Sequence, residues 1–163
     1  MAVLIRDHRI ASDSWQHTPD DQALPPGDVI VSFERWESER TWLLRRSGGL
    51  GLRVSGDVSV EEIAGDLSFF DLIALEFRAF TDGRCYSHAR LLRERFGFRG
   101  EIRAVGEVLR DQLYFLARCG VNAFEVGDEE HPEEWLKAFN EFSVQYQAAA
   151  DDAGPLYRRH RRA

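Results

Sequence analysis

The sequence predicts an α/β fold in which five repeated βα units form one parallel sheet. Three observations predict it. Within residues 28–147, short apolar runs rich in valine, isoleucine and leucine alternate with longer segments of helical character. Glycine, proline or acidic residues mark the boundaries of most of these segments. The 163 residues suffice for one hydrophobic core and are too few for two ordinary domains.

The five units are expected in chain order. Gly48 and Gly49 end the first helix, and Gly120 ends the fourth. Pro132 suits the first turn of the last helix, where its missing N–H is not needed. The strands are expected at residues 29–33, 50–54, 72–77, 101–105 and 123–126, and the helices at residues 37–46, 60–67, 86–96, 109–118 and 132–147.

The two ends of the chain do not follow this repeat. Residues 1–17 predict a short N-terminal β-ribbon, because two apolar runs flank the turn residues Asp7 and His8. Residues 18–27 are polar and rich in proline, which is typical of a linker. Residues 148–163 form a basic tail; we expect it to be disordered, with docking on an acidic partner as the alternative.

Four of the expected strands carry one charged residue between apolar neighbours, and the charges alternate in sign along the chain. If these side chains share one face, arginine and glutamate lie side by side on adjacent strands. Burial of an unpaired charge is expensive, so we predict that they pair. The alternative places them at strand ends in solvent. The four residues are Arg53, Glu76, Arg103 and Glu125.

These charges favour a curved sheet, a TIM-like half-barrel with a polar inner face, over an open flavodoxin-like sheet. The strands of an open doubly wound sheet are buried on both faces and are nearly unbroken apolar runs. Five units are too few to close a barrel, so the inner face of the half-barrel needs a cover. A homodimer, the N-terminal ribbon or the C-terminal tail can supply it, and we favour the homodimer.

Composition and charge exclude several classes of protein. Contents of 44% apolar and 30% charged residues are those of a globular protein. A formal net charge of −7 argues against nucleic acid and anionic membranes as partners. No apolar run approaches the roughly 20 residues that span a bilayer. Residues 1–7 lack the basic and apolar regions of a secretory signal, so we expect a cytoplasmic protein.

Residues 80–93 join the third strand to the next helix, at the edge of a parallel sheet where ligands bind. There Arg84 can make a forked contact to an oxyanion such as sulfite, sulfate or phosphate. A helix that begins near Ser87 points its free N–H groups into the same space. In the alternative, Asp82 and Ser87 only cap this helix, and Arg84 pairs with Glu76. The candidate anion-binding residues are Asp82, Gly83, Arg84, Ser87 and Arg90, and Asp111 and Gln112 are candidates at the same rim.

The sequence predicts no metal site and no cofactor. Cys85 and His88 are three residues apart and can meet on one helical face, but two ligands do not make a zinc site. Cys119 is interpreted as a small hydrophobic residue, and two cysteines are too few for a disulfide framework. No P-loop, dinucleotide fingerprint or nucleophile elbow is present.

Residues 75–126 resemble a bacterial family of unknown function, and the similarity extends over most of the chain. It rests on motifs in a fixed order: FTDGR at 80–84, YS and ARLLR within 86–93, GEIRAVG at 100–106, LRDQL at 109–113 and RCG at 118–120. Members of that family are usually encoded beside assimilatory sulfite reductase and are often labelled probable oxidoreductases of sulfite reduction. The family typically has glycine in place of Cys85, so a reaction shared by the family would not rest on that thiol.

The resemblance implies a pathway and not a reaction. We expect an accessory protein of assimilatory sulfite reduction that binds a small oxyanion or the sulfite reductase itself. The alternative is an enzyme whose half-barrel site is completed by a second subunit, with Glu76, Arg103 and Asp82 facing the substrate. A structural module without a ligand is the third hypothesis, and the sequence does not separate the three.

Overall fold

The computed structural model of the chain describes residues 2–127 and 131–140. One sheet of eight strands runs through it, in the order β2-β1-β8-β7-β6-β5-β4-β3. From β3 to β8 the neighbours pair in parallel, whereas β1 is antiparallel to both β8 and β2. The strands are β1 (Val3–Arg6), β2 (Arg9–Ala11), β3 (Gln16–His17), β4 (Val29–Ser32), β5 (Leu50–Ser55), β6 (Leu72–Phe77), β7 (Glu101–Gly106) and β8 (Ala123–Val126).

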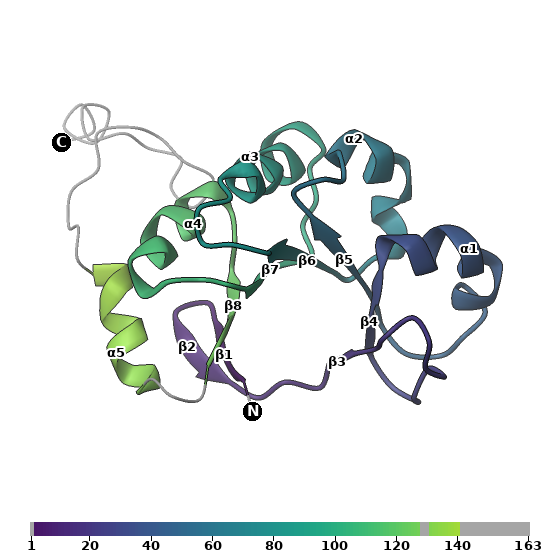
Figure 1. The fold of residues 1–163 in the computed structure, drawn as a ribbon, viewed down its shortest axis with the longest axis horizontal. Helices are drawn as coiled ribbons and strands as arrows, with labels where there is room; N and C mark the ends of the chain where they lie inside the picture. The colour runs from purple at the N-terminus through teal and green to yellow at the C-terminus, as the bar shows by residue number, and fades with distance from the viewer. Residues whose placement is uncertain (1, 128–130, 141–163) are drawn as a thin grey trace, which may run out of the picture.

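The sheet curls into a half-barrel, and Figure 1 shows helices α1 to α4 along its outer, convex side. The mixed α/β class and the curled half-barrel sheet are therefore confirmed. The α-helices are α1 (Phe33–Leu43), α2 (Val60–Ile63), α3 (Arg84–Arg90), α4 (Leu113–Cys119) and α5 (Pro132–Lys137). Shorter turns are the 3-10 helices η1 (Ala64–Phe69), η3 (Arg110–Gln112) and η4 (Ala138–Asn140) and the π-helix η2 (Leu91–Arg95).

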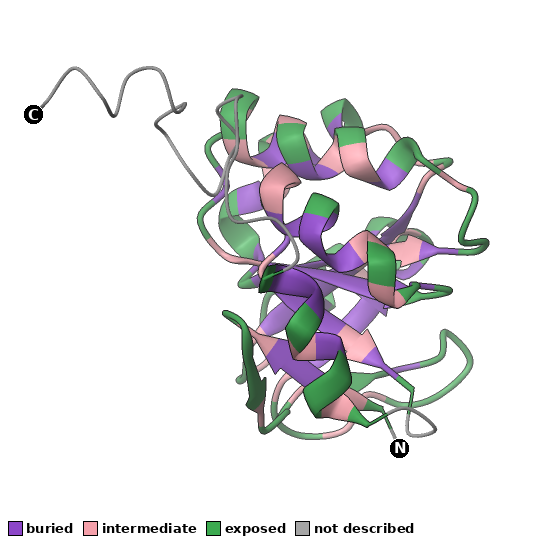
Figure 2. Ribbon diagram, turned by 90° about the vertical axis from the view of Figure 1, so that its left-hand side faces the viewer, coloured by how far each residue is buried: buried purple, intermediate pink, exposed green. Residues whose placement is uncertain are grey.

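Apolar residues pack on both faces of the sheet, because successive residues of a strand point to opposite sides. On the outer face, residues such as Leu52 and Ile73 pack with the helices in the main core. Figure 2 shows the strands and the inner sides of the helices largely buried, with exposed residues on the outer surface. On the inner face a smaller apolar cluster contains Ile30, Leu72, Ala74 and Val105.

The N-terminal residues pair as a short antiparallel hairpin around Asp7 and His8, and this hairpin is part of the main sheet. β1 pairs with β2 and also with β8, so it extends the sheet at one edge. β3 pairs with β4 at the opposite edge. Residues 12–15, which we call the strap, therefore run across the open side of the half-barrel (Figure 1). The two apolar runs of the predicted ribbon are β1 and β2, but the two-residue β3 and the pairing of β1 with β8 were not predicted, because so short a strand shows no hydrophobic period.

Several helices begin or change type at other residues than predicted. α1 begins at Phe33 because the Oγ of Ser32 accepts a hydrogen bond from the N–H of Arg35 at 3.0 Å. α3 begins at Arg84, so Ser87 lies inside the helix and not at its start. The helix predicted at residues 60–67 changes from α to 3-10 after its first turn. The predicted tail, residues 148–163, and the end of the last predicted helix, residues 141–147, lie outside the described residues.

The segment predicted as a linker, residues 18–27, is fixed to the domain by two arginine side chains. The Nη1 of Arg35 donates to the carbonyl oxygens of Pro19 and Gln22 at 2.9 and 2.8 Å. The Nη2 of Arg46 donates to two further carbonyl oxygens of the segment at 2.9 and 2.8 Å. These bonds satisfy backbone groups that lie outside regular structure, so the segment is an ordered part of the domain.

Candidate functional site

Charged side chains line the inner face of the half-barrel in two clusters. The four strand charges named above lie there, since their strand neighbours, such as Leu52 beside Arg53, are buried in the main core. Arg53 and Glu76 form an open ion pair with an N–O distance of 3.9 Å and side chains 27% and 32% exposed. Arg103 and Glu125 form a shorter pair, 2.8 Å, with side chains 0% and 15% exposed. The inner face thus has an open part and a buried part.

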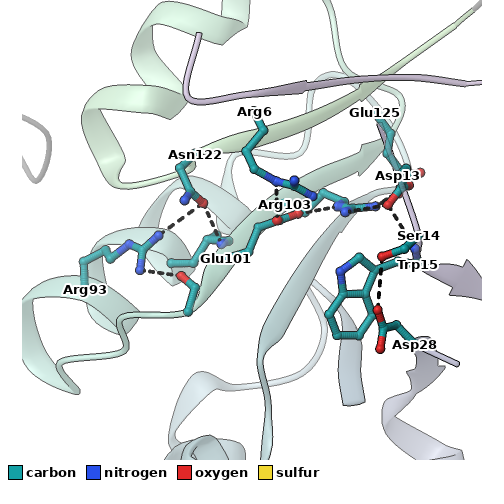
Figure 3. Close-up of polar contacts among 12 residues, drawn as sticks. Arg6, Asp13, Ser14, Trp15, Asp28, Arg93, Glu101, Arg103, Asn122 and Glu125 are labelled. Atoms are coloured by element: carbon teal, nitrogen blue, oxygen red, sulfur yellow. Dashed lines mark hydrogen bonds and ion pairs between the residues drawn. The ribbon is translucent and has the colours of Figure 1, made fainter. Parts of the chain in front are cut away.

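Arg103 is the centre of the buried cluster, which Figure 3 shows. Its guanidinium donates two hydrogen bonds to Asp13, at 2.8 and 3.1 Å. It donates one more to Glu101 at 2.7 Å and one to Glu125 at 2.8 Å. Asp13 lies in the strap, so this arginine joins the strap to strands β7 and β8. The sequence predicted the Arg103–Glu125 neighbourhood but not Asp13 or Glu101.

Hydrogen bonds keep Arg103 and Glu125 ionised in spite of their burial. Burial acts to lower the pKa of Arg103, but its carboxylate partners outweigh that effect and hold the pKa above its ordinary value. Burial acts to raise the pKa of Glu125, but hydrogen bonds from His17 and Arg103 bring it below its usual value. Arg6 of β1 adds a bond of 2.7 Å to Glu101. Each carboxylate that meets Arg103 therefore has charge-assisted partners.

The strap crosses the inner face, from Asp13 at Arg103 to Trp15 at the inner apolar cluster. Its Trp15 packs against the inner apolar cluster, and the Oγ of Ser14 donates to Asp28 at 3.0 Å (Figure 3). Gly49 lies beneath the indole, where a Cβ would be 2.7 Å from the ring. A cover was expected from a homodimer, the ribbon of residues 1–17 or the tail, and the strap that supplies it here lies within residues 1–17. The homodimer stays a prediction.

A chain of alternating charges leads from the open part of the inner face to the C-terminal rim of the half-barrel, and we call it the rim charge chain. Both of its contacts to Glu76 are longer than a hydrogen bond, whereas the contacts of Arg84 are hydrogen bonds. The members in order are Arg53, Glu76, Arg78, Asp57, Arg84 and Asp82, and the ion pairs between them measure 3.9, 3.6, 2.8, 2.7 and 2.8 Å.

Arg84, the predicted anion-binding arginine, is already engaged by two carboxylates. Its Nε and Nη2 donate to Asp82 at 2.9 and 2.8 Å, and its Nη1 donates to Asp57 at 2.7 Å. Hydrogen bonds from Arg84 hold the pKa of Asp82 at about 2. The alternative partner, Glu76, is not the one that Arg84 takes. A small oxyanion could reach this guanidinium only by displacing a carboxylate.

The other predicted anion-binding residues do not gather around Arg84. Gly83 precedes α3 without a side-chain cap, and Ser87 is exposed in the middle of this seven-residue helix. Arg90 pairs with Glu94 at 3.2 Å on the helix surface. Ser87 and Arg90 line an open groove of about 450 Å³ along α3 and η2 instead. The structure therefore separates them from the Asp82–Arg84 contact.

Gln112 joins two loops at the rim. Its Nε2 donates to the carbonyl oxygen of Phe80 at 2.8 Å, and its Oε1 accepts from the N–H of Leu109 at 2.9 Å. The side chains of Phe80 and Leu109 are 51% and 42% exposed. Asp111 lies near Tyr86, whose pKa is raised by burial and also by the Asp111 charge. Gln112 was a predicted rim residue, whereas Phe80 and Leu109 were named only as parts of the motifs at 80–84 and 109–113; Phe80 is a large apolar residue in a predicted loop, but Leu109 was expected to begin a helix.

The thiol of Cys85 is unsuited to nucleophilic chemistry. It is fully buried, and burial raises its pKa to about 12. Its sulfur lies 3.5 Å from the carbonyl oxygen of Glu76. The pKa of His88 is lowered by burial and by Arg84. Among residues 2–127 and 131–140, no group of three or more His, Cys, Asp or Glu side chains is placed to hold a metal ion.

A comparison with models of known protein families identifies the family of this chain. The model of a bacterial protein family of unknown function, DUF934, matches residues 51–157, more than half of the chain. Comparisons with curated proteins and with solved structures found no match. In the described part of the chain, every helix is too short or too polar to span a membrane. The matched span contains the whole rim charge chain, and the chain belongs to this bacterial family, DUF934.

Proposed function

We propose that the protein is an accessory protein of assimilatory sulfite reduction that binds the sulfite reductase through the rim of its half-barrel. The observation that carries the binding mode is the exposure of Phe80 and Leu109 on neighbouring loops at one edge of the sheet. We call these two residues the rim surface. The pathway is supported by the resemblance set out above, and the proposal places the protein in the cytoplasm.

The rim surface has the make-up of a protein interface. Exposed apolar side chains that polar residues surround mark binding sites for other proteins. Asp111 and the ion-paired Arg84 lie in the short helices that follow the loops of Leu109 and Phe80, η3 and α3. The two hydrogen bonds of Gln112 hold the loops in place before binding, so less ordering entropy is lost when a partner docks.

The geometry supports binding of a partner better than catalysis. The enzyme hypothesis needs Arg103 to face a substrate, but this side chain is 0% exposed and fully engaged by carboxylates. The Cys85 thiol is protonated at neutral pH because its pKa is about 12. Oxyanion binding at Arg84 would have to break hydrogen bonds to Asp82 and Asp57.

The test is to mix the full chain with the reductase subunits and measure their affinity. We expect one complex by size-exclusion chromatography, and we expect Phe80→Ala to weaken it by at least about thirtyfold, as for an aromatic hot spot. Trp42→Ala on α1 is the matched control, since Trp42 is also more than half exposed, at 56%. Separate elution of the proteins, or equal affinity of wild type and Phe80→Ala, would refute the proposal.

A further inference from the structure

We propose that Arg53 binds a small oxyanion, such as sulfate, sulfite or phosphate, on the open part of the inner face. The proposed site lies on strands β5 and β6, not on the loops that carry the rim surface. It therefore goes beyond the docking of a reductase and does not depend on it. The ligand class follows from the guanidinium, whose planar fork of N–H donors matches the oxygens of such anions.

Arg53 points to the inner face from the middle of β5. The residues before and after it, Leu52 and Val54, are buried in the main core on the other face. In the register of the sheet Arg53 lies between Ser32 of β4 and Ala74 of β6. Neither neighbour is charged, and the hydroxyl of Ser32 already donates to a carboxylate. The one ionic contact of this guanidinium among the described residues therefore comes from Glu76, two residues beyond Ala74 on β6.

The donors of Arg53 are unused among the described residues. Its one ionic contact there is Glu76 at 3.9 Å, beyond hydrogen-bond length, and no hydrogen bond to the guanidinium is found within residues 2–127 and 131–140. Arg84 and Arg103 instead make three and four hydrogen bonds to carboxylates. The side chain of Arg53 is 27% exposed, so an anion can reach it from solvent.

Ser55 is a second candidate donor on the same face of β5. It lies two residues further along β5, so its side chain points to the same face as Arg53. Its buried Oγ accepts from the N–H of Asp57 at 3.4 Å, and no acceptor for its proton is found in the described part of the chain. A guanidinium and a hydroxyl that both donate form a site for an oxyanion and not for a cation.

Glu76 acts as a loosely held competitor at this site. It lies 3.9 Å from Arg53 and 3.6 Å from Arg78, with a hydrogen bond to neither. Its carboxylate can turn towards Arg78, which is 62% exposed, while an anion takes its place at Arg53. Removal of this negative charge, about 4 Å from the guanidinium, should tighten anion binding by about fivefold in a water-like dielectric.

The experiment titrates sulfate, sulfite and phosphate into the full chain alone by calorimetry at low ionic strength. We expect saturable binding that Arg53→Gln weakens by at least about tenfold, as the loss of a charge-assisted hydrogen bond to an anion predicts. Glu76→Gln should bind about fivefold more tightly than wild type. Circular dichroism of each variant confirms that it is folded, and we expect Arg53→Gln to fold because it removes only one open ion pair.

Two matched controls locate the site. Arg84→Gln tests the arginine that is committed to Asp82 and Asp57, and Arg90→Gln tests one paired on the helix surface. Both should bind sulfate within about threefold of wild type, since surface charge alters binding only weakly. The inference is overturned if neither wild type nor Glu76→Gln binds any of the anions, or if Arg53→Gln binds them as wild type does. Since no reductase is present, either result leaves the docking proposal to its own test.

Discussion

Replacing Arg103 with methionine removes the cation from the centre of the buried cluster and keeps a side chain of similar length. Four hydrogen bonds to Asp13, Glu101 and Glu125 are lost in this change. Breaking a buried ion pair by removing one partner costs about 3–5 kcal/mol, because the other charge is left without compensation. We expect the lower end of that range, because the three carboxylates keep other ways of being stabilised after Arg103 is removed.

Each carboxylate that Arg103 leaves behind has another way to be stabilised. Glu101 keeps its bond to Arg6, and Glu125 keeps its bond to His17. Asp13 is 30% exposed and can turn to water. We therefore expect a loss of about 3 kcal/mol in the free energy of unfolding. For a domain of this size each kcal/mol lowers Tm by about 2–4 °C, so Tm should fall by about 6–12 °C.

The dependence on pH separates this account from a simple packing defect. The pKa of Glu125 is depressed in the folded protein, so its stabilising contribution is present above its ordinary pKa and is lost as the pH falls through the folded value. In Arg103→Met, Glu125 no longer has the Arg103 cation beside it, so protonation of Glu125 removes less stabilisation from the variant than from the wild type. The difference in Tm between wild type and Arg103→Met should therefore narrow between pH 7 and pH 4.

Thermal unfolding followed by circular dichroism at both pH values is the assay. Arg90→Met is the control, since an exposed pair four residues apart on a helix, such as Arg90 with Glu94, contributes only about 0.3–0.5 kcal/mol. A fall in Tm of less than about 2 °C for Arg103→Met would refute the reasoning, as it corresponds to no more than about 1 kcal/mol. A difference that stays constant from pH 7 to pH 4 would show that packing, and not charge, is what the variant loses.

Two further predictions concern the strap and the buried thiol. Trp15→Ala should lower the free energy of unfolding in urea by about 2–4 kcal/mol, because the indole packs on the inner apolar cluster; a loss below about 1 kcal/mol would contradict that packing. Cys85 should resist a thiol reagent at pH 8 in the folded protein and react once guanidinium unfolds it, because its pKa is about 12 when buried. Mass spectrometry of the labelled peptides checks this, and rapid labelling of Cys85 in the native state would count against it.

The inner charges were readable from the sequence because they follow from a local pattern. A single charge between apolar neighbours, as at Arg53 or Glu125, fixes the face of the strand on which it lies. The half-barrel followed from the same pattern, since a polar inner face is incompatible with a sheet buried on both sides. The start of α1 was also predictable, because Ser32 is a good capping residue. The first strand was instead predicted to run through Ser32 to residue 33.

The partners of these charges were not readable, because they come from distant parts of the chain. Asp13 meets Arg103 across 90 residues, and Asp57 meets Arg84 across 27. The strap has no hydrophobic period, so its course over the inner face depends on contacts that form only in the folded domain. Sequence reasoning therefore placed an anion at Arg84, whose carboxylate partners it could not see, and not at Arg53.

The inner face has a buried part around Arg103 and an open part around Arg53. We assign the anion to the open part and the docking of the reductase to the rim, and neither to the buried part. A guanidinium with several carboxylate partners, such as Arg103, is a poor receptor for another anion, because binding must first break charge-assisted hydrogen bonds. Asp13 of the strap also occupies this guanidinium. The side chain of Arg53 is 27% exposed with unused donors, and Phe80 lies in the loop that follows β6. Both residues lie within the span that matches the family, whereas Asp13, which the buried part depends on, lies before it.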